Sequence, residues 1–128
     1  MNATRSALLV EDDPNFCMIY TRILEPWDLE IVTTSSAYDA IELIRKRSFD
    51  FYSIDLQLLD ESADGLLSVL ESQGEATASR CVVVTSFDIL APAFTRFPIV
   101  AKTRLSTLGP HLTRILGTPA APCAGAIA

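Results

Sequence analysis

The chain lacks an excess of positive charge: 10 Lys and Arg residues oppose 16 Asp and Glu, and the formal net charge is -6 over 128 residues. Direct contact with nucleic acid or with an anionic membrane normally needs a basic surface, so we expect neither and favour a protein or a cation as the partner. No apolar run approaches the ~18 residues of a membrane span, and no signal peptide is visible before Glu11. We therefore expect a cytoplasmic protein.

Cysteine and histidine are scarce. The 3 cysteines, Cys17, Cys81 and Cys123, are an odd number without a C-x-x-C pair, which argues against a disulfide framework or a zinc site and predicts free thiols. The single histidine, His111, stands apart from the other chemically reactive side chains and is expected at the surface. Neither residue type is a candidate for catalysis.

Short apolar runs alternate with helical patterns along the whole chain. Hydrophobic residues make up 49% of the sequence and charged residues 20%, the balance of a globule with a real core. The runs that predict strands are 7–10, 30–34, 51–54, 81–84 and 99–101, and helical spacing is clear at 16–24, 37–44 and 105–116. This alternation predicts a flavodoxin-like, doubly wound α/β fold with a five-stranded parallel sheet in the order 2-1-3-4-5.

The length fits one domain, which we place at residues 1–116, followed by a flexible tail at 117–128 that is rich in Ala, Pro and Gly. Pro92 interrupts the apolar segment before the fifth strand, so the fourth helix is predicted to be short or irregular. Asp13 precedes Pro14, which favours a helix N-cap over a metal ligand. Gly109-Pro110 either kinks the last helix or marks its start.

Polar side chains stand at the ends of four predicted strands. These are Glu11 with Asp12, Asp55, Thr85, and Lys102. Parallel strands end at one edge of a sheet, where such folds bind ligands, so we expect these side chains to converge. Close carboxylates repel by about 4 kcal/mol per pair at an effective dielectric of about 20. Magnesium and the Lys102 ammonium would offset that repulsion, and the set suits phosphoryl transfer with Asp55 as nucleophile.

Four motifs together resemble the receiver domain of two-component response regulators. They are Leu-Leu-Val-Glu-Asp-Asp-Pro at 8–14, Asp55, Val-Val-Thr-Ser at 83–86 and Val-Ala-Lys at 100–102. The resemblance covers about residues 5–116. It implies that Asp55 accepts a phosphoryl group from a histidine kinase or histidine phosphotransfer protein, that Thr85 binds a phosphoryl oxygen, and that Lys102 pairs with it.

The resemblance also implies a metal site and a route for water. Mg²⁺ would be held by Glu11, Asp12, Asp55 and the backbone carbonyl of Gln57. The side chains of Gln57 and Phe87 would flank the water that hydrolyses the acyl phosphate, with Gln57 able to orient it and Phe87 excluding it. Asp60, Glu61 and Asp64 are expected in a solvated loop.

Several positions depart from the receiver pattern. Leu59 and Ala63 stand where receivers usually have Pro and Gly, so the loop after the third strand is predicted to be two residues longer. Thr103 replaces the usual proline after the lysine, and a trans or strained bond is expected because a cis bond there costs about 3 kcal/mol. Ile99 replaces the usual aromatic switch. Residues 97–102 resemble a subgroup of stand-alone receivers with a Phe-Ala-Thr-Gly turn, which matches here only at its threonine.

Three functions follow as alternatives. The first is a stand-alone phosphoacceptor that signals by binding an unidentified downstream protein. The second is a pseudo-receiver, a binding module that ignores phosphorylation. The altered loop and Thr103 make it plausible, but the intact set of five strand-end residues argues against it. The third is a magnesium-dependent phosphohydrolase, which is disfavoured because Gln57 stands where a general acid would be needed.

Overall fold

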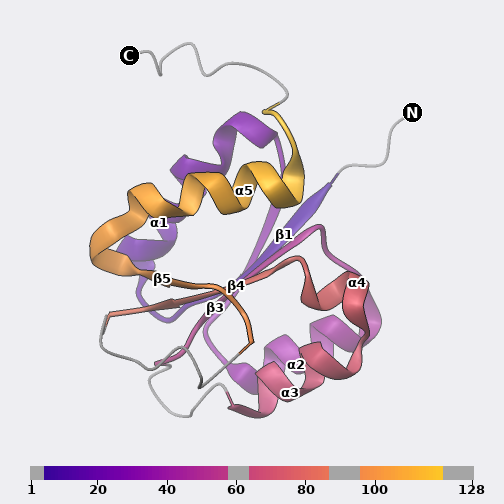
Figure 1. Ribbon diagram of the computed structural model, residues 1–128. Coiled ribbons are helices and arrows are strands. Elements are labelled where there is room, and N and C mark those ends of the chain that lie inside the picture. Colours follow the sequence, from indigo (N-terminus) through magenta and orange to yellow (C-terminus); the bar gives the residue numbers. More distant parts are fainter. Residues whose placement is uncertain (1–4, 58–63, 87–95, 120–128) are drawn as a thin grey trace.

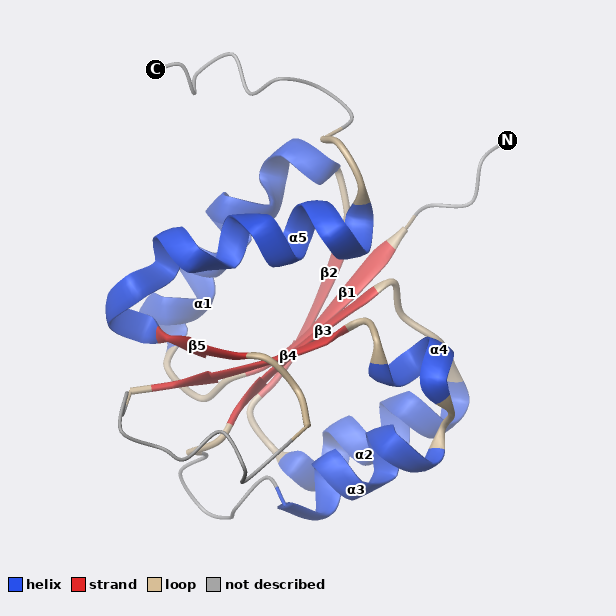
Figure 2. Ribbon diagram, in the orientation of Figure 1, coloured by secondary structure: helices blue, strands red, loops and turns tan. Residues whose placement is uncertain are grey.

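The computed structural model describes residues 5–57, 64–86 and 96–119 (Figure 1). The described residues form a five-stranded parallel sheet in the order β2-β1-β3-β4-β5, with helices on both faces (Figure 2). The strands are β1 (Ser6–Val10), β2 (Glu30–Thr34), β3 (Phe51–Asp55), β4 (Cys81–Thr85) and β5 (Ile99–Ala101). The predicted fold class and strand order are confirmed.

The register of the sheet aligns the strand ends. Val10 lies opposite Ile54 in the β1–β3 pair, and Thr85 lies opposite Ala101 in the β4–β5 pair. β1, β3 and β4 are buried along their whole length, which explains why their sequences are apolar runs rather than alternating patterns. The polar residues at the ends of these strands therefore lie at the carboxyl edge of the sheet.

Helices cover the two faces in pairs. They are α1 (Pro14–Leu24), α2 (Ala37–Lys46), α3 (Asp64–Ser72), α4 (Glu75–Ala78) and α5 (Leu108–Leu116), with 3-10 turns η1 (Glu25–Trp27) and η3 (Lys102–Thr107). α1 and α5 lie on one face, and α2 and α3 lie on the other (Figure 2). α3 and α4 were not located by sequence periodicity. The fourth helix predicted between β4 and β5 falls outside the described residues.

The ends of α1 and α5 test the predictions made for Asp13, Pro110 and Gly117. Asp13 is the N-cap of α1, as predicted, and its side chain accepts a hydrogen bond from the Asn15 backbone at 3.0 Å. α5 begins at Leu108, so Pro110 stands in the first turn and marks the start of the helix rather than a kink. Gly117 ends this helix with φ of 84°, a value that favours glycine.

Among the described residues, neither the two thiols nor the histidine belongs to the strand-end cluster. Cys17 and Cys81 are free, as predicted, and burial raises the pKa of Cys81 to about 12. His111 is half-buried beside Arg114 rather than fully exposed, and burial lowers its pKa. Cys123 lies outside the described residues. Within the described part of the chain, no helix is long and apolar enough to cross a membrane.

Candidate functional site

Three carboxylates meet at the carboxyl edge of the sheet. Glu11 and Asp12 follow β1, and Asp55 ends β3. One oxygen from each of the three lies within 4.8 Å of the other two. Glu11 and Asp55 are buried, and Asp12 is half-buried. The convergence of these three residues is therefore a property of the fold, and it forms a compact set of hard oxygen donors.

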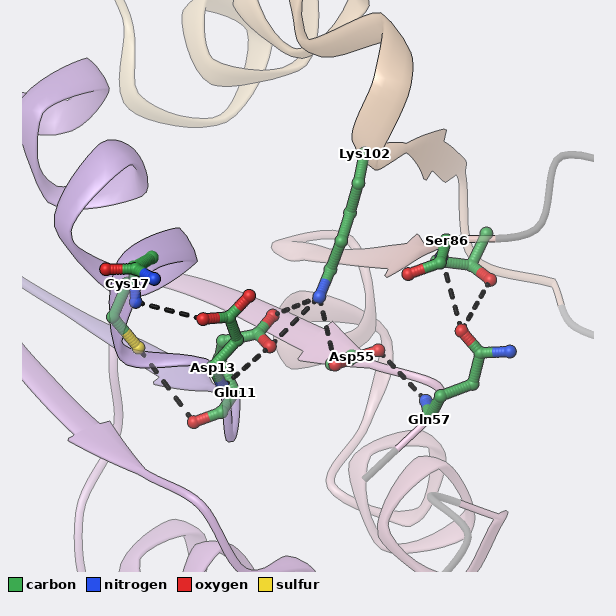
Figure 3. Close-up of polar contacts among 9 residues, drawn as sticks. Glu11, Asp13, Cys17, Asp55, Gln57, Ser86 and Lys102 are labelled. Carbon is green, nitrogen blue, oxygen red and sulfur yellow. Dashed lines mark hydrogen bonds and ion pairs between the residues drawn. The ribbon is translucent and has the colours of Figure 1, made fainter. Parts of the chain in front are cut away.

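Lys102 reaches into this cluster from the end of β5 (Figure 3). Its Nζ lies 2.9 Å from the carboxylate of Glu11 and 3.2 Å from Oδ2 of Asp55. The same ammonium lies 4.4 Å from the centre of the Phe16 ring on α1, a cation–π distance. Burial alone would lower the pKa of Lys102, but the hydrogen bonds and charges of Glu11 and Asp55 outweigh it and raise the pKa. Lys102 is thus held in its charged form.

Glu11 carries the clearest sign that the cluster is short of positive charge. Burial raises the pKa of this carboxyl to about 7, against the lowering effect of Lys102, and the negative charge of Asp55 adds to the rise. Oε2 accepts hydrogen bonds from Lys102 and from the Asp13 backbone. Oε1 is buried and lies 2.9 Å from the Lys102 ammonium, as an ion pair rather than a hydrogen bond. One ammonium shared between two buried carboxylates offsets their negative charge only in part, so a further cation would stabilise the cluster.

The donor set fits a magnesium ion. Mg²⁺ prefers carboxylate and carbonyl oxygens and keeps several waters, and Glu11, Asp12 and Asp55 supply three carboxylates on one side of the site. Lys102 supplies a single positive charge against these three carboxylates. Asp13 is committed to its helix cap and lies at the side of this group (Figure 3).

Both oxygens of Asp55 are oriented by neighbours. Oδ1 accepts a hydrogen bond from the Gln57 backbone at 2.9 Å, and Oδ2 accepts from Lys102. The strand that carries Asp55 is fully buried, so the carboxylate is held at a defined place at the sheet edge. Such positioning is what phosphoryl transfer to a carboxylate requires.

The side chain of Gln57 was not predicted to contact the end of β4, but it does. Its Oε1 accepts from the Thr85 hydroxyl at 3.3 Å and from the Ser86 backbone at 3.2 Å. The signal in the sequence is weak. Gln57 follows the end of β3 and Thr85 is the last residue of β4, and these strands pair in the sheet, so the proximity of the two residues depends on the strand order. Thr85 itself is fully buried.

Cys17 lies beside the cluster without reactive character. Its Sγ lies 3.9 Å from the backbone oxygen of Glu11. Burial raises the pKa of this thiol, and the nearby acids Glu11 and Asp13 raise it further. A protonated thiol is a poor nucleophile, so the prediction that Cys17 is not catalytic is consistent with its surroundings.

Other sequence predictions fall partly outside the described residues. These are the loop residues Leu59, Asp60, Glu61 and Ala63, and the water-excluding Phe87. Asp64, which was predicted to lie in the same loop, is instead the first residue of α3, so the loop prediction is wrong at this position. The described residues contain no cis peptide bond, so the bond between Lys102 and Thr103 is trans.

The fold and the strand-end cluster define a flavodoxin-like domain with an acidic pocket and a lysine at the carboxyl edge of its sheet. The family model of the response regulator receiver domain matches residues 7–95. The chain therefore belongs to the response regulator receiver domain family. Receiver domains are generally signalling modules of two-component systems rather than enzymes in their own right.

Individual relatives agree with this assignment. The chain is 26% identical over 86 residues to the transcriptional regulatory protein ZraR of Escherichia coli O157:H7, a match that covers 67% of this chain and 19% of the relative. A CheY-like receiver domain from Methylobacillus flagellatus superposes with a TM-score of 0.71 at 27% identity, covering 88% of this chain and 99% of that one.

A second solved structure has a similar fold at lower identity. It is the receiver domain of a sensor histidine kinase from Pseudomonas aeruginosa PAO1, which has a magnesium ion coordinated in its active site cleft. It matches with a TM-score of 0.73 at 16% identity, covering 91% of this chain and all 100% of that one.

Proposed function

We propose that this receiver accepts a phosphoryl group on Asp55 from a phosphohistidine of a histidine kinase or histidine phosphotransfer protein in the cytoplasm. The observation that carries the proposal is the buried cluster in which Asp55 lies beside two further carboxylates and within 3.2 Å of the Lys102 ammonium. The signal then passes by contact with a downstream protein. A net charge of -6 favours a protein partner over nucleic acid.

The transfer step uses groups that the site already positions. A carboxylate oxygen of Asp55 attacks the phosphorus, the new O–P bond forms, and the N–P bond to the histidine breaks. The departing imidazole takes up a proton from solvent. Lys102 offsets the charge on Asp55 and the phosphoryl group, and the Thr85 hydroxyl donates to a phosphoryl oxygen. Positioning and charge neutralisation supply most of the catalysis in such reactions.

Magnesium would be held by Glu11, Asp12, Asp55 and the backbone carbonyl of Gln57. When bound, it would neutralise charge that develops on the phosphoryl oxygens. Support comes from the three converging carboxylates, which face a single ammonium charge from Lys102. The magnesium ion in the Pseudomonas receiver domain is a parallel on the same fold.

A second candidate is a binding module that works without phosphorylation. One observation favours it: Lys102 already bridges Glu11 and Asp55, so part of the acidic charge is neutralised without a metal. A phosphohydrolase is less well supported, because the amide of Gln57 cannot serve as a general acid and is engaged with Thr85 and Ser86.

Intact mass spectrometry after incubation with acetyl phosphate and Mg²⁺ separates these functions. We expect a single phosphoryl adduct on the parent protein and none on Asp55→Ala. Asp39→Ala removes an exposed carboxylate on α2 and should still form the adduct. Absence of an adduct on the parent protein would favour the binding module, and rapid release of phosphate without an adduct would favour the hydrolase.

A further inference from the structure

Gln57 links the end of β3 to the end of β4 (Figure 3). Its backbone N–H is bound to Asp55 at 2.9 Å, which holds the residue beside the candidate phosphoacceptor. Its side-chain oxygen accepts from Thr85 Oγ1 and from Ser86 N, at 3.3 and 3.2 Å. A backbone N–H can only donate, so the amide oxygen rather than the nitrogen must face Ser86.

Two donors that converge on one oxygen make an oxygen-binding site. One of them is the Thr85 hydroxyl, which under the proposed function donates to a phosphoryl oxygen on Asp55. The present occupant is a neutral amide oxygen at distances near the long end for hydrogen bonds. A phosphoryl oxygen carries negative charge, and hydrogen bonds to charged acceptors are shorter and about twice as strong. The phosphoryl group would therefore displace the amide.

We propose that Gln57 is a positioning residue whose side-chain oxygen occupies the phosphoryl-oxygen site of the unmodified protein and leaves it when Asp55 is phosphorylated. The inference rests on the proposed function, because it assumes that Asp55 receives the phosphoryl group. The side chain keeps Thr85 and Ser86 in place to bind an oxygen. It also competes with the phosphoryl group, so Gln57 sets how readily the modified state forms.

Beryllofluoride, a phosphoryl mimic, tests the competition directly. Its affinity is measured by calorimetry in the presence of Mg²⁺ on the full chain, on Gln57→Ala and on Gln57→Glu. Both variants retain the backbone carbonyl assigned to the metal. Gln57→Ala should bind about three- to tenfold more tightly, because two weak hydrogen bonds no longer have to be exchanged. Gln57→Glu should bind more weakly, because a carboxylate is the stronger acceptor and repels the mimic.

Two further measurements exclude other roles of the side chain. Gln73→Ala makes the same chemical change at an exposed position after α3 and should leave the affinity unchanged. The amide resonance of Ser86 should shift in Gln57→Ala, since Ser86 is exposed and water replaces its acceptor. A purely structural role would lower the melting temperature and leave the affinity unaltered.

The outcomes distinguish this inference from the proposed function. Equal affinity of the parent and Gln57→Ala for beryllofluoride overturns the role of Gln57 and leaves phosphoryl acceptance standing. Failure of both proteins to bind the mimic overturns both. A change confined to the lifetime of the aspartyl phosphate would assign Gln57 to water orientation and would also overturn the inference.

Discussion

At the scale of single residues, the fold changes the pKa of Glu11, a carboxylate of the candidate metal site. It is buried, and it shares the Lys102 ammonium with Asp55. Its pKa of about 7 follows mainly from burial, with the charge of Asp55 adding to it. The metal-free protein therefore binds a proton near neutral pH at a place where a cation is expected.

The stability of the metal-free protein should depend on pH through Glu11. Its folded pKa is about 7, above the ordinary carboxyl value of 4.5, so the folded state holds the proton more tightly. This contribution is fully present below about pH 4.5 and is lost as the pH rises through 7, and between about pH 5.5 and 7.5 the loss is about 2 kcal/mol. Urea unfolding in the presence of a chelator at about pH 5.5, 6.5 and 7.5 measures this loss of stability.

Glu11→Gln provides the control for this prediction. The glutamine amide does not titrate. The free energy of unfolding of the variant should therefore change less between about pH 5.5 and about pH 7.5 than that of the parent. Parallel pH profiles of the parent and the variant would show that Glu11 is not the titrating group.

Lys102 should stabilise the metal-free site. Lys102→Met leaves Glu11 and Asp55 without their ammonium, and we expect a loss of about 3 kcal/mol at neutral pH in chelator, because buried charges lose their partner. Millimolar Mg²⁺ should then raise the melting temperature of the variant more than that of the parent. Lys46→Met, at an exposed position on α2, is the control. An equal magnesium response in parent and Lys102→Met would contradict the shared role of the two cations.

Among the elements, the start of α1 separates two acidic residues with different tasks. Asp13 caps the helix with its side chain, and Asp12 points its oxygen into the carboxylate cluster. The two residues are adjacent, which makes them a sharp test of the assignment. A cap acts on the stability of the helix, whereas a metal ligand acts on the response to magnesium.

Asp13→Ala should lower the free energy of unfolding by about 1 kcal/mol and leave the magnesium response intact, because only the cap is lost. Asp12→Ala should abolish the gain in melting temperature that millimolar Mg²⁺ gives the parent, a gain that follows RT ln(1 + [L]/Kd). Thermal unfolding with and without Mg²⁺ measures both. A retained magnesium response in Asp12→Ala would count against the site.

At the scale of the whole molecule, one sheet serves two cores. The core on the α1 and α5 side contains Leu112 and Trp27, and the core on the α2 and α3 side contains Leu70. Trp27 also donates from Nε1 to the Gly117 carbonyl at 2.8 Å, which ties the end of α5 to the turn after α1. Both cores pack on the same strands, so each depends on the other for a folded sheet.

Unfolding should therefore be a single transition. Leu70→Ala and Leu112→Ala each remove a fully buried side chain, and each should cost about 2–5 kcal/mol. Circular dichroism reports the whole chain, and Trp27 fluorescence reports the α1 side. The two signals should coincide in both variants. A fluorescence transition that precedes the loss of helix in Leu112→Ala would show that the two cores melt separately.

The sequence alone determined the fold class and the members of the candidate site. Buried parallel strands need apolar runs, and the connections between them need helices, so the pattern permits few topologies. The sheet register then brings residues after the strand ends together, which made Glu11, Asp55 and Lys102 predictable as neighbours. Asp13 as a cap followed from Pro14 in the same local way.

Only the tertiary structure decided how these side chains are connected. That Lys102 bridges Glu11 and Asp55, and that Gln57 reaches Thr85 and Ser86, depends on side-chain torsions and on loop paths. Neither quantity is encoded in spacing along the chain, because strand-end residues distant in sequence meet only after the sheet has formed. The same holds for the raised pKa of Glu11, which arises mainly from burial by neighbours that no local pattern specifies.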